Sequence, residues 1–466
     1  MAQKDTILIL GGDGYLGWTL GLAFGNRTPF RVVLVDNLIK REWEKEVGAK
    51  LLVPFKSPRT RIAEYQKIFG KSNILFEKVE LLDQDACVRV IEKYQPFAII
   101  NAAEQPSVPF SMMSAKNAAV TFSNNIIGHL NVLWAIAAVN KDIRYIKLGS
   151  AGCYMDIDTD YLPLDKKDFT FEHEGKVRKI LNSWFPMQAT DFYHQSKISD
   201  FLINDLCSTV WKLKILTVQQ STIFGATIDE NRDVENHSLS TRFNYDSVFS
   251  TVLNRFVCQI AIGHPLTVYG DGSQTTGLIS LTDTVDHFLE FSEKDIKPGE
   301  HEVAHNYTHR LSIKDIAETL TKIAGAADVQ YIENPRKEGS GSLKKEVEIH
   351  PVVAKGHVKK DRWLRAELVD LLDFTKRYKD NIDRSIIMPT IRWEHAPTET
   401  KKEAGAAQKK IFFNYGTVGP ISAPAYKAAS KFLEEYFHIG PPEILLKYEP
   451  YIEKLGEEVA DLLNCD

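Results

Sequence analysis

The sequence predicts an α/β fold with a doubly wound parallel sheet, followed by a smaller substrate-binding part. Three observations support this prediction. Short apolar runs alternate with helix-like patterns, a glycine-rich turn directly follows the first run, and the alternation becomes irregular after about Thr222. Strands that alternate with helices are typical of βαβ units, in which the strands lie parallel.

The expected strands are short apolar runs bounded by turn residues. A helix-like pattern lies between them, for example over Val120–Val139. Because such runs suit the interior of a parallel sheet, we expect five of them to be its strands: Thr6–Leu10, Arg31–Asp36, Ala98–Ala102, Arg144–Leu148 and Leu213–Gln219.

The chain divides into three parts by pattern. We expect a dinucleotide-binding core at about residues 1–222 and a substrate-covering part at about 223–395. Residues 396–409 are rich in Ala, Thr, Lys and Glu and contain no large apolar residue, as in a linker. A new apolar pattern begins at residue 410.

Composition sets limits on function and location. The 466 residues are 44% hydrophobic and 26% charged, and the formal net charge is −5. This balance gives no basic footprint for nucleic acid or a membrane surface. The five cysteines are scattered without metal-ligand spacing, which predicts no metal site and a reducing compartment. With no signal peptide and no uninterrupted apolar run near the roughly 20 residues of a membrane span, we expect a cytoplasmic protein.

The glycine-rich turn predicts a dinucleotide site. Gly11, Gly14 and Gly17 form a G-x-x-G-x-x-G pattern between the first strand and the first helix. Such glycines let the backbone approach a pyrophosphate, and the helix N-terminus then points N–H groups at it. Asp36 ends the next strand, where an acid suits the ribose hydroxyls of NAD and repels the extra phosphate of NADP. A purely structural turn is the alternative.

A second motif predicts proton transfer. Tyr193 and Lys197 form Y-x-x-x-K, and residues four apart share one face of a helix. A nearby ammonium lowers the pKa of a phenol, so we expect Tyr193 to exchange a proton with a substrate hydroxyl. Ser150, just after the fourth expected strand, is placed to bind the same hydroxyl. The alternative is that Tyr193 and Lys197 are exposed neighbours on one helix with no catalytic role.

Together these motifs resemble the extended short-chain dehydrogenase/reductases, the NAD-dependent epimerase/dehydratase family. Within that family the resemblance is to UDP-sulfoquinovose synthases, and it covers roughly residues 5–395. The stretches that carry it include Gly11–Trp18, Val35–Leu38, Asn125–Val132, Phe192–Lys197 and Gly263–Gly270.

The resemblance implies a Rossmann-like fold and a redox-neutral cycle on a sugar nucleotide. NAD would take hydride from C4 of UDP-glucose, water would leave across C5–C6, sulfite would add at C6, and the hydride would return. A homodimer is also implied. The implied cofactor-binding residues are Gly11, Gly14, Tyr15, Leu16, Gly17, Asp36, Asn37, Ala102, Ala103, Asn125, Tyr193 and Lys197. The implied substrate-binding residues are Gln105, Gln220, Asn254, Arg255, Thr267, Tyr269, Gln274 and Arg336.

The sequence departs from the family pattern at several positions. Ser150 stands where those enzymes have Thr, and Cys153 stands where they have Glu. Thr276 and Thr282 stand where arginines are expected. Two members of the expected catalytic set stay ambiguous: His194 is a proton shuttle or a buried, bonded imidazole, and Cys153 is a weak acid, a nucleophile or an inert core thiol.

Two other functions compete with the sulfoquinovose-synthase-like one. A nucleotide-sugar 4-epimerase or 4,6-dehydratase uses the same C4 chemistry, and the loss of Glu at position 153 favours epimerase-like chemistry. A non-catalytic NAD-binding scaffold belongs to another class. The retention of Ser150, Tyr193 and Lys197 together argues against the scaffold.

The segment at 410–466 resembles the start of a class V aminotransferase. Its N-x-G-T-x-G-P pattern lies within Ile411–Pro420. In such enzymes, the lysine that carries pyridoxal phosphate lies much further along than these residues extend. We therefore expect a partial PLP-transferase-like segment without PLP chemistry.

Overall fold

The computed structural model describes residues 5–154, 161–162, 166–234, 237–325, 327–333, 348–349 and 364–387. Contacts divide the chain between His395 and Ala396. The predicted linker at 396–409, the aminotransferase-like segment at 410–466 and the expected substrate residue Arg336 all lie outside the described residues, so these predictions stay predictions.

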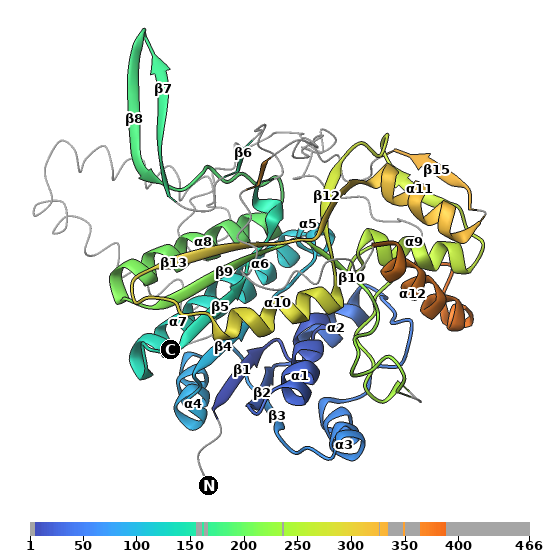
Figure 1. The fold of residues 1–466 in the computed structure, drawn as a ribbon, viewed down its shortest axis with the longest axis horizontal. Coiled ribbons are helices and arrows are strands. Elements are labelled where there is room, and N and C mark those ends of the chain that lie inside the picture. The colour runs from blue at the N-terminus through green and yellow to red at the C-terminus, as the bar shows by residue number, and fades with distance from the viewer. Residues whose placement is uncertain are drawn as a thin grey trace, which may run out of the picture. The chain divides into compact units, whose positions relative to one another are not determined.

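A seven-stranded parallel sheet forms the centre of the fold (Figure 1). Its order is β13-β9-β5-β4-β1-β2-β3, which places β1 between β4 and β2. The order of the first four strands, 3-2-1-4, is that of a doubly wound, Rossmann-like fold, as the sequence predicted. The strands are β1 (Thr6–Leu10), β2 (Arg31–Asp36), β3 (Ile74–Lys78), β4 (Ala98–Asn101), β5 (Arg144–Leu148), β9 (Lys214–Gln220) and β13 (His301–Asn306).

Helices cover both faces of this sheet. Ile7 and Ile9 of β1 pack in a core with α1 (Tyr15–Arg27) and α10 (Leu281–Glu293). Leu8 and Leu10 point to the other face and pack with α4 (Gln84–Tyr94), α7 (Gly128–Val139) and α8 (Phe192–Trp211). Alternate residues of a strand point to opposite faces, so a strand buried on both sides is apolar throughout.

The sheet differs from the prediction at its two edges. Neither β3 nor β13 is among the five expected strands. Each contains charged or polar residues, such as Glu77 and Lys78 in β3 and His301 and Glu302 in β13. β13 pairs with β9 from His301 to Asn306, far beyond residue 222. The expected boundary at 222 therefore does not separate the parallel sheet from the substrate-covering part.

The remaining elements form a second core and several smaller features. β10 (Thr222–Phe224), β12 (Thr275–Ser280) and β14 (His309–Ser312) make a three-stranded sheet, and β11 (Leu266–Tyr269) pairs with β15 (Val329–Ile332). Their core is completed by α9 (Val252–Ala261), α11 (Ile313–Ala324) and α12 (Leu364–Arg377). The hairpin β7 (Lys167–His173) and β8 (Lys176–Ser183) extends away from the main body (Figure 1).

A continuous helical stretch runs through α6 (Ala115–Phe122), the π-turn η1 (Ser123–Ile127) and α7. In the described part of the chain, it is the one helix whose length and composition alone would allow it to cross a membrane. Its α7 part covers the sheet through Val132, Leu133 and Ile136, which are buried. The core helix of a protein without a membrane span meets the same criteria of length and composition. This helix is therefore only weak evidence for a membrane crossing.

Candidate functional site

The glycine turn lies at the carboxyl end of β1 and is built for close backbone contact. Gly11 has a φ of +81°, and a Cβ there would lie 2.5 Å from the carbonyl oxygen of Ala102. A Cβ on Gly17 would lie 2.0 Å from the Gly11 carbonyl oxygen. Gly14 caps α1 without any side-chain bond to the first-turn N–H groups. Those N–H groups are suited to bind an anion such as a pyrophosphate.

The acid at the end of β2 lies next to this turn. The Asp36 carboxylate accepts hydrogen bonds from the Asp13 N–H at 2.9 Å and the Leu38 N–H at 2.6 Å. Burial raises the pKa of Asp36 above its ordinary value. Asn37 donates to Glu80 at 2.9 Å. Asp36 lies beside the glycine turn, where the sequence predicts contact with a ribose of NAD. The glycine turn and Asp36 together are suited to bind NAD.

Further expected cofactor residues surround the turn. The first turn of α1 carries Tyr15 and Leu16, and the Tyr15 hydroxyl donates to the Gly225 carbonyl at 2.6 Å. This bond connects the first helix to the substrate-covering part. Ala102 packs directly on Gly11, and Ala103 follows it.

Asn125 and Gln105, expected to bind cofactor and substrate, bond to the protein itself. The Asn125 amide accepts from the Gln105 N–H at 2.8 Å and donates to Ser196 at 3.0 Å. The Gln105 amide donates to the Ser107 carbonyl at 2.9 Å and to Thr121 at 2.8 Å. With both its amide hydrogens bonded inside the protein, the Gln105 side chain shapes the loop and is not placed to grip a substrate.

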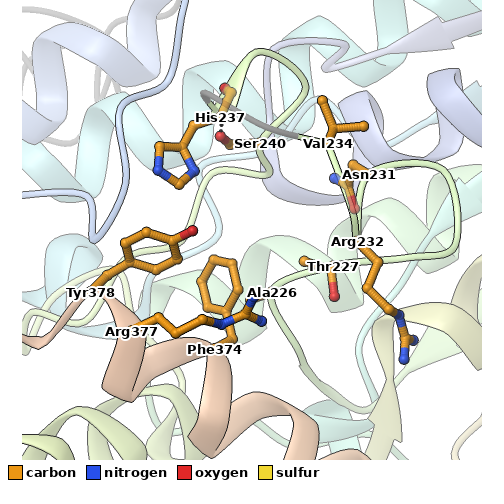
Figure 2. Close-up of a pocket in the computed structure, with 10 residues that line it drawn as sticks. All are labelled: Ala226, Thr227, Asn231, Arg232, Val234, His237, Ser240, Phe374, Arg377 and Tyr378. Carbon is orange, nitrogen blue, oxygen red and sulfur yellow. Dashed lines mark hydrogen bonds between the residues drawn. The ribbon is translucent and has the colours of Figure 1, made fainter. Parts of the chain in front are cut away.

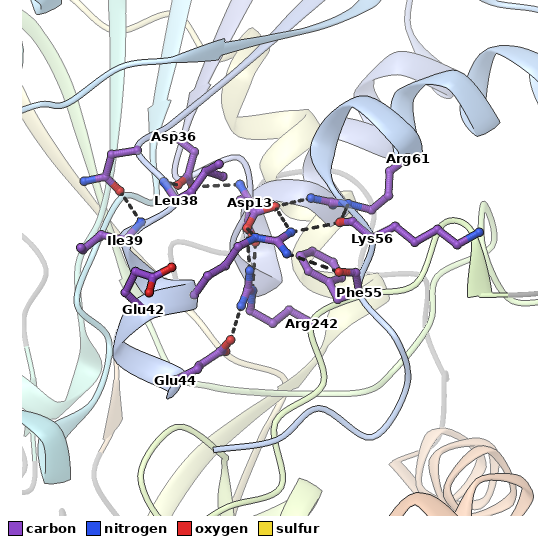
Figure 3. A network of polar contacts seen from close by, with 12 residues as sticks. Asp13, Asp36, Leu38, Ile39, Glu42, Glu44, Phe55, Lys56, Arg61 and Arg242 are labelled. Carbon is purple, nitrogen blue, oxygen red and sulfur yellow. Dashed lines mark hydrogen bonds and ion pairs between the residues drawn. The ribbon is translucent and has the colours of Figure 1, made fainter. Parts of the chain in front are cut away.

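A group of charged side chains, the Asp13 cluster, is centred on a residue of the glycine turn (Figure 3). The Asp13 carboxylate pairs with Arg242 at 2.6 Å, with Arg41 at 2.7 Å and with Arg61. Arg242 also pairs with Glu44. Since Asp13 belongs to the turn and Arg242 to the substrate-covering part, the cluster joins the two parts. Its members are Asp13, Arg41, Glu44, Arg61 and Arg242.

Tyr193 and Lys197 lie in the first turns of α8, but their electrostatics differ from the prediction. The Lys197 ammonium donates to the Leu148 carbonyl at 2.5 Å and lies 2.7 Å from Glu104 and 3.4 Å from Asp200. Burial, followed by the charge of Glu104, raises the pKa of the Tyr193 phenol above its ordinary value. The pKa of the phenol is therefore shifted in the direction opposite to the one expected from Lys197.

The other expected catalytic residues gather around the start of α8. Ser150 is buried, and its hydroxyl accepts from the Gly152 N–H at 3.1 Å. His194 Nδ1 lies 2.6 Å from the Asp191 carboxylate, and its ring packs 5.0 Å from that of Tyr193. A Cβ on Gly152 would meet the His194 ring at 2.1 Å, so glycine is needed there. Ser150, Tyr193 and His194 therefore share one location.

Cys153 is fully buried in a small apolar cluster with Tyr154 and Ile198. Burial raises the pKa of its thiol to about 12. A thiolate is the reactive form of cysteine, and this environment disfavours it. Of the alternatives left open by the sequence, the structure favours an inert core thiol.

Five of the expected substrate residues lie on or beside the second core, and several are bonded within it: Asn254, Arg255, Thr267, Tyr269 and Gln274. Arg255 donates to the Tyr269 hydroxyl at 2.9 Å. The Thr267 hydroxyl accepts from Gln259 at 2.8 Å in a buried position, which makes its side chain structural. Gln274 donates to the Tyr269 carbonyl, and Asn254 is buried at the start of α9. Gln220 instead ends β9 of the main sheet, where it accepts from Asn306 of β13.

Sequence analysis missed the roles of Glu104, Lys147 and Asp200. Lys147 is fully buried in β5 and pairs with Glu104 and, at 3.2 Å, with Asp200. A signal was present, because a lysine within the apolar strand Arg144–Leu148 needs a buried counter-charge. Glu104, Lys147, Lys197 and Asp200 are called the Lys197 cluster below.

A small cavity elsewhere is not this site (Figure 2). It lies against α12, contains none of the expected catalytic, cofactor or substrate residues, and has a volume of about 20 Å³. That volume holds about one water molecule, whereas ligand sites are usually several hundred Å³. Its lining residues are Ala226, Thr227, Asn231, Arg232, Val234, His237, Ser240, Phe374, Arg377 and Tyr378.

Comparisons with known proteins agree with this geometry. The family model of the NAD dependent epimerase/dehydratase family matches residues 7–174. The chloroplastic UDP-sulfoquinovose synthase of Spinacia oleracea is 31% identical over 397 residues, covering 84% of this chain and 80% of that protein. The UDP-sulfoquinovose synthase of Sulfolobus acidocaldarius is 31% identical over 400 residues, covering 83% and 97%.

Solved structures show the same fold at lower identity. The UDP-glucuronic acid 4-epimerase from Bacillus cereus, in complex with UDP-glucuronic acid and NAD, has a TM-score of 0.55 at 18% identity. The match covers 80% of this chain and 99% of that chain. The UDP-glucose 4-epimerase of Thermus thermophilus, in complex with NAD, has a TM-score of 0.53 at 16% identity and covers 80% and 99%.

Proposed function

This chain belongs to the NAD-dependent epimerase/dehydratase family and uses NAD as its cofactor, and on that premise we propose that it is a UDP-sulfoquinovose synthase. The proposed substrates are UDP-glucose and sulfite. The proposal is supported by one arrangement at the carboxyl end of the sheet: Ser150 follows β5, the Lys197 ammonium bonds to the last carbonyl of β5, and the Gly11 turn follows β1. Tyr193 lies one helical turn before Lys197 in α8. Ligands of open α/β sheets bind at this edge.

NAD, when bound, supplies a reversible hydride acceptor for C4 of the sugar. Tyr193 takes the proton of the C4 hydroxyl and returns it at the end of the cycle. Ser150 holds the same hydroxyl by a hydrogen bond, and Lys197 supplies a fixed positive charge one helical turn from the phenol. The glycine turn and the α1 N-terminus hold the pyrophosphate, and Asp36 holds a ribose.

The carbon chemistry follows from the 4-keto group, which acidifies the C5–H bond. We assign removal of that proton to His194, because Asp191 fixes its ring 2.6 Å away and the ring touches Tyr193. The C6 hydroxyl then leaves as water with the proton that His194 took from C5, and a C5–C6 double bond remains. Sulfite forms a C–S bond at C6, C5 regains a proton, and C4 is reduced again. Cys153 takes no part, because burial keeps its thiol protonated.

One assay tests this function. Purified protein is incubated with UDP-glucose and sulfite, and the products are identified by mass. We expect a sulfonated sugar nucleotide only when both substrates are present. The matched control is Tyr193→Phe, which should keep its NAD, measured after heat release, and form no product.

Other outcomes would contradict the proposal. Conversion to UDP-galactose with no sulfonated product would make the chain a 4-epimerase, and an accumulating 4-keto-6-deoxy sugar would make it a dehydratase. Full activity in Tyr193→Phe would remove the mechanism. Protein that binds NAD but converts no UDP-, dTDP- or GDP-sugar would be a scaffold.

We also propose that the chain is a homodimer paired through α7 and α8. Leu202, Leu206 and Val210 follow one another at four-residue spacing along α8 and are 53%, 60% and 61% exposed. Trp134 of α7 is 48% exposed and its ring lies 4.5 Å from that of Trp211. Contiguous exposed apolar side chains mark interaction surfaces. Sedimentation should give a dimer, and Leu206→Glu with Val210→Glu should give a monomer that still binds NAD.

A further inference from the structure

The Lys197 cluster buries four charged side chains under the proposed catalytic residues. The side chains of Lys147 and Lys197 are 0% and 1% exposed, and those of Glu104 and Asp200 are 4% and 2% exposed. Burial of a charge is costly unless it is paired. Two ammonium and two carboxylate groups give this cluster no net charge, which makes its burial possible.

In this cluster, one oxygen of each carboxylate lies close to both lysine ammonium groups. Glu104 Oε1 accepts from both Lys147 and Lys197. Asp200 Oδ2 lies 3.2 Å from Lys147 and 3.4 Å from Lys197. Among the described residues, the second oxygens, Glu104 Oε2 and Asp200 Oδ1, are buried and accept no hydrogen bond.

These contacts restrict Lys197 more than a surface pair would. An ammonium has three N–H groups, and Leu148, Glu104 and Asp200 supply three acceptors around this one. The orientation of Lys197 therefore depends on Glu104, which Lys147 in turn contacts through the same oxygen. Lys147 comes from β5, Glu104 from the segment after β4, and Asp200 from α8, so three elements fix the arrangement.

We propose that Glu104 and Lys147 are positioning residues for Lys197, and that the net charge of the four-residue cluster sets how readily Tyr193 gives up its proton. The inference rests on the proposed function, because it assigns Tyr193 as the proton acceptor. It goes beyond that function by naming two residues outside the expected catalytic, cofactor-binding and substrate-binding sets.

The neighbouring titratable groups agree with this assignment. The charge of Glu104 raises the pKa of Tyr193, after burial, and the charge of Lys147 opposes it. Burial lowers the pKa of His129 well below its ordinary value and raises that of Tyr145, so both stay neutral near pH 7. Cys153 also stays neutral, and Asp191 is paired with His194. The imidazole that lies beside the phenol is that of His194.

Charge-changing variants test the proposal. Glu104→Gln leaves the cluster with one excess positive charge, Lys147→Met leaves it with one excess negative charge, and the double variant is neutral again. The measured quantity is the rate at which a sugar nucleotide reduces the bound NAD, followed against pH. That rate rises with pH as Tyr193 loses its proton, and the midpoint of the rise is compared between variants.

We expect opposite shifts. Glu104→Gln should lower the midpoint by about one pH unit, Lys147→Met should raise it by about one unit, and the double variant should return it close to the wild-type value. A residue with only a structural role would reduce the rate without moving the midpoint. Shifts in the same direction, or unmoved midpoints, would overturn the proposal.

Two controls keep the test decisive. The same variants in a His194→Gln background should show the same shifts, which excludes His194 as the titrating group. NAD released by heat and the thermal unfolding transition show whether each variant folds. If Lys147→Met does not fold, Lys147→Gln replaces it, because it removes the same charge and must also raise the midpoint.

Failure of this inference can be told apart from failure of the proposed function. The test needs only reduction of the bound NAD and no sulfite. A wild-type chain that reduces its NAD but forms no sulfonated product would refute the synthase function and leave this experiment intact. An active wild type whose variants do not shift in opposite directions would refute only the role of Glu104 and Lys147.

Discussion

The Asp13 cluster and the Lys197 cluster both bury charge at the carboxyl end of the sheet, but they are balanced differently. The Asp13 cluster sets three guanidinium groups against two carboxylates, and the Lys197 cluster is neutral. In the Asp13 cluster, the guanidinium of Arg61 also stacks on Trp18 at 4.0 Å and Phe55 at 3.9 Å. Aromatic faces stabilise an excess of positive charge.

The difference indicates two uses of buried charge. Arginine keeps its charge at any pH that a protein meets and bonds as a rigid fork, which suits a permanent connection. The Asp13 cluster is such a connection, between the glycine turn and the substrate-covering part. Lysine and carboxylates change their proton affinity with their surroundings, which suits the tuning of Tyr193 assigned to the Lys197 cluster.

The largest effect should follow the loss of the acid at the centre of the Asp13 cluster. Asp13→Asn removes the carboxylate that pairs with all three arginines. Removing one partner of a buried pair costs about 3–5 kcal/mol in the free energy of unfolding. Denaturant unfolding measures this. The matched control is Glu42→Gln, whose side chain is 62% exposed and pairs with Lys45 on the surface, and which should change stability little. A similar small change in Asp13→Asn would contradict the comparison.

A smaller effect should follow the loss of one arginine. Arg41 is 28% exposed, and its removal leaves Arg61 and Arg242 on the Asp13 carboxylate. Arg41→Gln should therefore cost about 1–2 kcal/mol, the range of a charge-assisted hydrogen bond that is partly screened. Arg242→Gln should cost more, because Glu44 then loses its buried partner as well. The reverse ranking in denaturant unfolding would show that exposure does not set these costs.

Most of the fold could be predicted from the sequence because its central strands are apolar. Thr6–Leu10, Arg31–Asp36 and Arg144–Leu148 form strands with the expected bounds. The edge strands β3 and β13 could not be predicted, because they are buried less evenly and contain charged or polar residues. β13 also follows β9 by about eighty residues, and only tertiary contact brings it to the sheet.

The candidate site was predictable where a motif is local and not where contacts are long-range. The glycine turn and the helix pair Tyr193 and Lys197 follow from spacing alone. The partners of Lys197 do not, because Glu104 lies 93 positions before it in the chain. The expected lowering of the Tyr193 pKa therefore missed burial and the charge of Glu104, which together raise it.

The smallest effect concerns a third charged group, which is less buried than either cluster. Burial acts to raise the pKa of Asp205, but contacts with His301 and with Lys166 at 3.0 Å outweigh it and lower that pKa to about 2. A carboxylate whose pKa is lower in the folded state adds stability above its unfolded value of about 3.9, and this stability is lost as pH falls toward 2. Solvent screening limits the gain to less than about 1 kcal/mol. The free energies of unfolding of wild type and Asp205→Asn should therefore differ at pH 7 and converge on acidification. A gap that stays constant at low pH would assign the difference to packing instead of charge.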